Sequence, residues 1–239
     1  MKRIILLVFR LLYRIPGWLM KIRYYNKHLE ETSFEERFQF ARSIVLKINQ
    51  KSRVHMHIYG QENLPEEQGY LMAPNHQGLF DPLIIFESHE KPFKAILKKE
   101  LTDVFVLKDV IRLLEFESID RDNLRTTMKV IKKASREMSQ GINYLIFPEG
   151  TRCRKQNQML EFKAGTFKTA IDAKKPIVPI ALIDCYKVFD NNTIAFVDAQ
   201  VHYLKPLYYE DYKDMNSSQI ARVVQTRIQE CIEKNEKNS

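Results

Sequence analysis

Apolar residues recur at helical spacing in two stretches near the start of the chain. The first runs from about residue 4 to residue 20, and Pro16 with Gly17 is expected to break or kink it. The second opens with Ser33 and Glu36, which form a capping-box pattern, and continues to about residue 50. The pattern in the first 50 residues therefore predicts two helices that precede the rest of the chain.

Beyond residue 50, short apolar runs alternate with amphipathic stretches of helical period. Strands alternating with helices predict an α/β domain over residues 51–239, with a mixed, largely parallel sheet flanked by helices. The expected strands are 54–59, 69–73, 94–97, 116–119, 143–147, 177–182, 193–197 and 201–204. The expected helices are 81–87, 123–138, 165–173 and 217–234.

The formal net charge of +8 is by itself typical of a nucleic-acid-binding protein. The excess is confined to the N-terminus, because seven basic residues precede the first acidic residue, Glu30, and the remainder holds 31 basic and 30 acidic residues. A nearly neutral body without a nucleic-acid-binding motif argues against a nucleic-acid partner. The seven residues are Lys2, Arg3, Arg10, Arg14, Lys21, Arg23 and Lys27.

These basic residues are interleaved with apolar ones. No uncharged run approaches the roughly 18 residues that a spanning helix needs. On a helical wheel, Arg3, Arg10 and Arg14 form one stripe beside a mostly apolar surface, which is typical of a helix lying on an anionic membrane. We therefore expect residues 1–50 to hold the protein, as a peripheral or monotopic protein, on the cytoplasmic face of the cell membrane. An ordinary helix packed on the domain is the alternative.

Cysteine and histidine positions give little sign of a metal site. Cys153, Cys185 and Cys231 are isolated, which fits a reducing cytosol and argues against disulfides or a structural zinc. His55 and His57 alternate along an expected strand, and the sequence offers them no third ligand. A strand face is the favoured interpretation, and no metal is expected.

A candidate for acid–base chemistry lies at the end of the strand 69–73. His76 follows this strand, and Asp81 with Pro82 resembles a helix start. Gly78 lets the intervening loop fold back, so the Asp81 carboxylate can reach the imidazole, fix its tautomer and stabilise the imidazolium. Such strand-to-helix turns are where open α/β sheets bind ligands. A simple helix cap at Asp81 is the alternative.

A second motif, Phe147-Pro148-Glu149-Gly150-Thr151-Arg152, also follows an expected strand. Gly150 lets the backbone approach a ligand, and Arg152 offers a planar donor fork suited to phosphate. A solvated basic loop is the alternative interpretation of this stretch alone.

Together, the two motifs resemble those of the glycerolipid acyltransferase family, whose best-known members are the 1-acyl-sn-glycerol-3-phosphate acyltransferases. Its N-H-x4-D pattern is matched by Asn75, His76 and Asp81, and its F-P-E-G-T-R pattern by residues 147–152. Two departures are the absent Pro after K-x-E-L and Leu114-Glu115 in a region where the family usually has Gly. Shorter matches, between about residues 53 and 203, are Gly60-Gln61-Glu62-Asn63-Leu64-Pro65, Lys98-Lys99-Glu100-Leu101, Ile119-Asp120-Arg121, Phe162-Lys163-Ala164-Gly165 and Ile177-Val178-Pro179-Ile180.

The resemblance implies a role for each matched residue. His76 would act as general base on the acceptor hydroxyl, which attacks the acyl thioester directly, and Asp81 would orient His76. Arg152 would bind the acceptor phosphate. The other substrate-binding residues would be Glu149, Gly150, Thr151, Lys98 and Arg121.

The implied reaction moves a fatty acyl group from acyl-CoA or acyl carrier protein to the free hydroxyl of lysophosphatidic acid. The product would be phosphatidic acid, in phospholipid biosynthesis, and no cofactor beyond the acyl donor is implied. Glycerol-3-phosphate or another lysophospholipid is an alternative acceptor. A non-enzymatic membrane adaptor that retains the fold is the alternative of another class.

Overall fold

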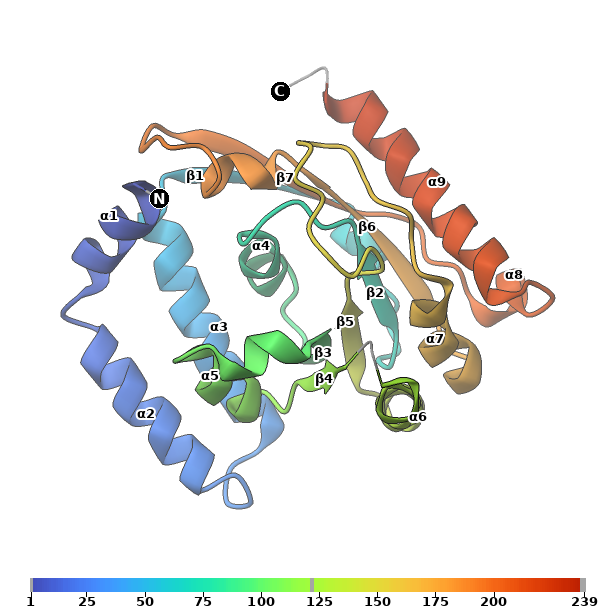
Figure 1. The fold of residues 1–239 in the computed structure, drawn as a ribbon, viewed down its shortest axis with the longest axis horizontal. Coiled ribbons are helices and arrows are strands. Elements are labelled where there is room, and N and C mark those ends of the chain that lie inside the picture. The colour runs from blue at the N-terminus through green and yellow to red at the C-terminus, as the bar shows by residue number, and fades with distance from the viewer. Residues whose placement is uncertain (1, 121–122, 237–239) are drawn as a thin grey trace.

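The computed structural model describes residues 2–120 and 123–236, which form one seven-stranded sheet with helices on both faces (Figure 1). The strand order is β1-β7-β6-β2-β5-β3-β4, and every neighbouring pair is parallel except β6 and β7. This confirms the predicted mixed, largely parallel sheet. The strands are β1 (Val54–Tyr59), β2 (Leu71–Pro74), β3 (Phe93–Lys98), β4 (Glu117–Ile119), β5 (Asn143–Ile146), β6 (Ile177–Ile183) and β7 (Val197–Tyr203).

The predicted pair of strands at 193–197 and 201–204 is wrong, because a single strand, β7, spans most of this region. Asp198 and Gln200 point away from the core, whereas Ala199 and Val201 are fully buried. This alternation is that of a half-buried strand, and its polar positions do not interrupt the hydrogen-bonded ladder.

Helices cover the two faces of the sheet separately. On one face, the helices from α2 through α5 share a core with the sheet residues Met72, Leu145 and Val178. On the other face, the helices from α6 through α9 share a core with Leu71 and Tyr144. The helices are α1 (Lys2–Leu11), α2 (Ile15–Lys27), α3 (Phe34–Lys51), α4 (Asp81–Ser88), α5 (Leu107–Leu113), α6 (Leu124–Ser139), α7 (Lys168–Ala173), α8 (Tyr209–Tyr212) and α9 (Ser217–Asn235). Short 3-10 turns are η1 (Gln61–Asn63), η2 (Lys99–Asp103), η3 (Ala164–Phe167) and η4 (Cys185–Val188).

The first 50 residues contain three helices, so the predicted number of two is wrong. The chain turns between Leu11 and Ile15, and Pro16 lies in the first turn of α2. Proline is tolerated there because the amide hydrogen it lacks would have no partner inside the helix. The third helix, α3, places Phe38 in the core beside α4, and the predicted division of the chain near residue 50 stays a prediction.

Helix α1 is fixed to the domain by its arginines. Arg3 is fully buried, and its guanidinium donates to the carbonyl oxygens of Ser52 at 2.8 Å, Arg53 at 2.9 Å and Ala195 at 2.7 Å. Arg10 donates to the Lys51 carbonyl at 3.0 Å. The predicted basic stripe therefore faces the protein at these two positions. Arg14, the third residue of the stripe, is exposed. The exposed apolar residues between residues 2 and 14 are Ile4, Ile5, Val8, Phe9, Leu12 and Tyr13.

Candidate active site

The two sequence motifs meet at one edge of the sheet. Because β2, β3 and β5 are parallel, their carboxyl ends lie together. His76 follows β2, Glu149 follows β5, and Lys98 is the last residue of β3. The strand order places β5 between β2 and β3, so the loops after these three strands are neighbours.

His76 and Asp81 form the predicted pair. The Nδ1 atom of His76 lies 2.7 Å from Oδ2 of Asp81. The same Oδ2 accepts from the backbone nitrogens of Gln77 at 2.6 Å and Gly78 at 2.9 Å, so the carboxylate folds the loop around itself. With Nδ1 bonded to a buried carboxylate, Nε2 is the nitrogen left to exchange a proton with a substrate.

The alternative interpretation of Asp81 as a helix cap is wrong. Phe80 is the N-cap residue of α4, Asp81 is the first residue of the helix, and Pro82 lies in the first turn. The Asp81 carboxylate is fully buried and bonds to the preceding loop. Its second oxygen, Oδ1, has no hydrogen-bond partner among the residues that the structure describes, a cost that folding alone does not explain.

Glu149 ties the second motif to the first. Its Oε1 accepts from the backbone nitrogen of His76 at 2.6 Å, and its Oε2 accepts from the backbone nitrogen of Leu160 at 2.8 Å. The residue is 1% exposed, and burial raises the pKa of its carboxyl to about 7. Both oxygens are therefore used within the protein. Its predicted contact with the acceptor stays a prediction, whereas its bond to the His76 loop is observed.

An aromatic contact adds to this connection. The imidazole of His76 stacks on the ring of Phe147, with centroids 4.1 Å apart and planes 28° apart. The first residue of the second motif thus holds the ring plane of His76, while Asp81 holds one edge of the ring. The side chain of His76 is 19% exposed, so the edge of the ring that carries Nε2 can contact a substrate.

Four other predicted site residues, Lys98, Gly150, Thr151 and Arg152, lie at the same edge of the sheet. Gly150 adopts a left-handed φ of +70°, which glycine reaches without steric cost. Thr151 is exposed, and Arg152 and Lys98 are half-buried. Arg121 lies outside the residues that the structure describes.

Buried amide side chains that the sequence did not single out as site residues hold the loop of residues 75–81 in place. Gln77 donates from Nε2 to Oδ1 of Asn157 at 2.7 Å and accepts at Oε1 from the backbone nitrogen of Cys185 at 2.9 Å. Asn157 in turn donates to Oδ1 of Asp184 at 3.1 Å. Asn75 exchanges two hydrogen bonds with the backbone of Leu182 in β6. Only Asn75 carried a signal, because it belongs to the matched motif.

One departure from the family pattern has a structural basis. Glu115 has a left-handed φ of +50°, a conformation that glycine adopts freely. Its carboxylate is bonded to Arg37 and lies 2.8 Å from Nζ of Lys94, a buried lysine. These ion pairs offset the backbone strain at Glu115 and connect α3 to the start of β4.

His55 and His57 lie on the exposed face of β1, as predicted. Asp198 of β7 lies beside both, 2.9 Å from Nε2 of His57 and 3.6 Å from Nδ1 of His55. Across residues 2–120 and 123–236, no group of three or more histidine, cysteine or acidic residues could hold a metal ion.

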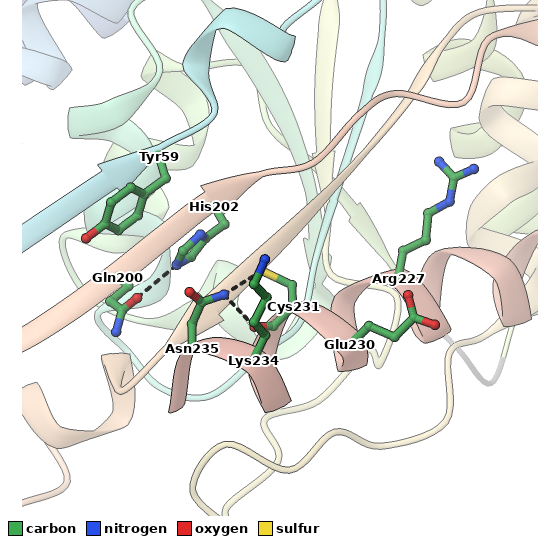
Figure 2. A pocket seen from close by; sticks show the side chains of 8 residues that line it. All are labelled: Tyr59, Gln200, His202, Arg227, Glu230, Cys231, Lys234 and Asn235. Carbon is green, nitrogen blue, oxygen red and sulfur yellow. Dashed lines mark hydrogen bonds between the residues drawn. The ribbon is translucent and has the colours of Figure 1, made fainter. Parts of the chain in front are cut away.

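A separate hollow of about 600 Å³ lies between β7 and the last turns of α9. Figure 2 shows its lining, with Tyr59 stacked on His202 at 4.5 Å on the strand side and Arg227 and Lys234 on the helix side. None of the predicted site residues lines it. The catalytic candidates therefore belong to the loops at the sheet edge.

Comparisons with known proteins point to the same family. The chain is 32% identical, over 69% of its length, to the "Probable 1-acyl-sn-glycerol-3-phosphate acyltransferase" of Mycoplasma pneumoniae and covers 63% of that protein. It is 29% identical, over 62% of its length, to the human "1-acyl-sn-glycerol-3-phosphate acyltransferase alpha" and covers 52% of it. The chain thus spans somewhat more than half the length of these relatives.

The fold is also shared with a solved structure. The "1-acyl-sn-glycerophosphate (LPA) acyltransferase, PlsC" of Thermotoga maritima superposes with a TM-score of 0.73 at 18% identity, covering 99% of this chain and 98% of that one. The sequence model of the acyltransferase family matches residues 55–183, a segment that includes His76, Asp81 and the whole second motif. The chain therefore belongs to the acyltransferase family.

Proposed function

We propose that this protein transfers a fatty acyl group from an acyl thioester to the free hydroxyl of lysophosphatidic acid, forming phosphatidic acid for phospholipid biosynthesis. The observation that carries the proposal is the 2.7 Å contact between His76 Nδ1 and a fully buried Asp81. It leaves Nε2 of His76 for a substrate hydroxyl at the edge where Arg152 and Lys98 supply positive charge. Relatives that bear the name of this activity support the assignment.

The proposed reaction is a direct transfer. The acceptor hydroxyl gives its proton to Nε2 of His76 as its oxygen attacks the thioester carbonyl carbon. The imidazolium is stabilised by the Asp81 carboxylate. When the tetrahedral intermediate collapses, the carbon–sulfur bond breaks and the leaving thiolate takes the proton back from His76. The ester, the free thiol and neutral His76 result, so no covalent enzyme intermediate is needed.

In this proposal, the exposed part of the second motif makes most of the contacts with the acceptor. Because both oxygens of Glu149 are bonded to backbone nitrogens, we assign the phosphate to Arg152, with Lys98 and Arg121 adding charge. Gly150 and Thr151 lie between Glu149 and Arg152 and would contact the acceptor through their backbone and hydroxyl. We propose no cofactor beyond the acyl-CoA or acyl carrier protein that bears the acyl group.

The exposed apolar side of α1 is the proposed contact with an anionic lipid surface. Phe9 is 79% exposed and Ile5 is 64% exposed, and Met20 and Tyr24 of α2 are also exposed. No helix within residues 2–120 and 123–236 is long and apolar enough to cross a membrane. We propose a peripheral or monotopic position on the cytoplasmic face of the cell membrane, with residues 1–50 as the membrane-associating part.

An acceptor panel tests the substrate assignment. Purified protein with lipid vesicles is offered lysophosphatidic acid, glycerol-3-phosphate and a neutral lysolipid. Lysophosphatidic acid is expected to be preferred, and Arg152→Ala should raise its KM about tenfold to a hundredfold, since a hydrogen bond to a charged group contributes roughly 1.5–3 kcal/mol. A preference that survives Arg152→Ala unchanged would place the phosphate elsewhere.

A further inference from the structure

Helix α6 carries an uninterrupted line of positive charge on its outer surface. Arg125, Lys129, Lys132 and Arg136 are all exposed and recur at intervals of four, three and four residues, which places them on one stripe. None of the four pairs with a carboxylate of any described residue. We call these four residues the α6 basic stripe.

The α6 basic stripe weakens the helix that carries it. Arg125 lies in the first turn, where the helix dipole disfavours a cation, and the first turn holds no acidic residue. Arg125 with Lys129, and Lys132 with Arg136, are like-charge pairs four residues apart, and such pairs destabilise a helix. Among residues 2–120 and 123–236, no carboxylate pairs with these four cations, so an external negative partner is a source of compensation.

Two apolar side chains lie beside the stripe at the start of α6. Leu124 is 75% exposed and Met128 is 38% exposed. They continue the apolar face by which Ala134 and Met138 enter the core, but they extend past the packed part of the domain. Together with Arg125, Lys129 and Lys132 they line an open, shallow hollow of about 490 Å³. A cationic rim around an apolar centre is the anatomy of a protein-docking surface.

The position of α6 relates the stripe to the active site. The helix starts just after β4, so its first turn lies at the sheet edge that carries His76. Three strand spacings, about 14 Å, separate β4 from β2. Figure 1 shows α6 on the opposite side of the molecule from α1 and α2, and it packs against the other face of the sheet. The α6 basic stripe and the exposed residues of α2 thus belong to helices on different faces of the sheet.

From this arrangement we propose that the α6 basic stripe is the docking surface for an acidic acyl carrier protein that delivers the acyl thioester. The inference rests on the proposed function, because it names the source of the acyl group. Coenzyme A fits less well, since the four cations extend over about 16 Å of the helix and the hollow that three of them line is open and shallow, whereas small ligands are mostly enclosed by their sites. A negatively charged helix of a carrier protein matches both the length and the charge of the stripe.

The test compares two donors with the same acyl chain, one on acyl carrier protein and one on coenzyme A, using full-length protein on vesicles. The double variant Lys129→Glu, Lys132→Glu should raise the KM for the carrier-protein donor at least about tenfold and abolish most of its salt dependence. Its kinetics with acyl-CoA should stay within about twofold of wild type. The matched control Arg222→Glu, Lys234→Glu, on the exposed side of α9, should affect neither donor.

Each other outcome overturns the inference. A rise in KM for acyl-CoA as well would assign the stripe to coenzyme A phosphates. A loss of vesicle co-sedimentation, with both donors slowed equally, would assign it to the membrane. If the wild type is active with acyl-CoA but inactive with acyl carrier protein, the carrier protein is not the donor, and the proposed function still holds. A lack of transfer from either donor by the wild type would instead reject the proposed function itself.

Discussion

The buried carboxylate of Glu149 accepts a hydrogen bond of 2.6 Å from the backbone nitrogen of His76. The glutamate of the second motif thus holds the histidine of the first motif. Because its other oxygen accepts from Leu160, the same side chain also fixes the loop that follows the motif. The two motifs, 73 residues apart at this contact, form one hydrogen-bonded unit.

Glu149 should make stability depend on pH. Burial raises the pKa of its carboxyl in the folded protein to about 7, from an ordinary value of 4.5. A raised pKa contributes stability that is fully present below about pH 4.5 and is lost as pH rises through about 7. The wild type should therefore lose up to about 3 kcal/mol of unfolding free energy between pH 5 and pH 8 that Glu149→Gln does not lose. Urea unfolding of both proteins at the two pH values measures this difference, and equal slopes would contradict it.

Two substitutions of Asp81 should separate folding from catalysis. Asp81→Ala leaves the backbone nitrogens of Gln77 and Gly78 without their acceptor, at a cost of about 1–3 kcal/mol each. Asp81→Asn keeps an acceptor oxygen but removes the charge that stabilises the His76 imidazolium. We expect Asp81→Asn to remain folded and to lose a factor of about 10²–10⁴ in kcat. Chemical denaturation and steady-state kinetics check the two effects, and full activity of a folded Asp81→Asn would exclude the proposed role.

Arg3 should decide whether α1 stays on the domain. Arg3→Met keeps much of the side-chain volume but removes all three donors to Ser52, Arg53 and Ala195. Since hydrogen bonds from charged groups contribute roughly 1.5–3 kcal/mol each, α1 should detach and the connection before Ile15 should be cleaved faster by proteases. Limited proteolysis measures the rate. Lys2→Met, at an exposed neighbouring position, should leave it unchanged.

The apolar side of α1 should govern binding to lipid. Phe9→Asp replaces a side chain that is 79% exposed, and burying a phenylalanine contributes about 1.5–3 kcal/mol. We expect the partition coefficient for anionic vesicles, measured by co-sedimentation, to fall at least about tenfold. Leu124→Asp on α6, also well exposed, is the control and should bind as the wild type does. Equal losses in both variants would show that α1 has no special role.

Local patterns predicted much of the fold. Ser33, which was predicted to open a helix, caps α3 by accepting from the Glu36 nitrogen at 3.1 Å. The predicted helix at 123–138 matches α6 closely. These signals act within three residues, so a sequence reveals them. The pairing of His76 with Asp81 was also accessible, because a five-residue spacing with Gly78 permits few alternatives.

The remaining features depend on distant partners. The partners of Arg3 are up to 192 residues away, so a helical wheel could not show that its stripe faces inward. Asn157 lies 80 residues from Gln77, in a loop without regular structure, and has no pattern of its own. The bond from the His76 backbone to Glu149 was also hidden, because motif membership does not reveal which way a side chain points, and the predicted contact of Glu149 with the substrate stays a prediction. In each of these cases, contacts between distant parts of the chain fix the position of the side chain.

The central claim is that Nε2 of His76 takes the proton of the acceptor hydroxyl. The most direct measurement is the steady-state kinetics of His76→Ala with lysophosphatidic acid as acceptor, beside His55→Ala as an exposed-histidine control. We expect kcat to fall by about 10²–10⁴ with an acceptor KM within about twofold of wild type, because a general base acts in the transition state. Undiminished acyl transfer by a folded His76→Ala protein would contradict the mechanism.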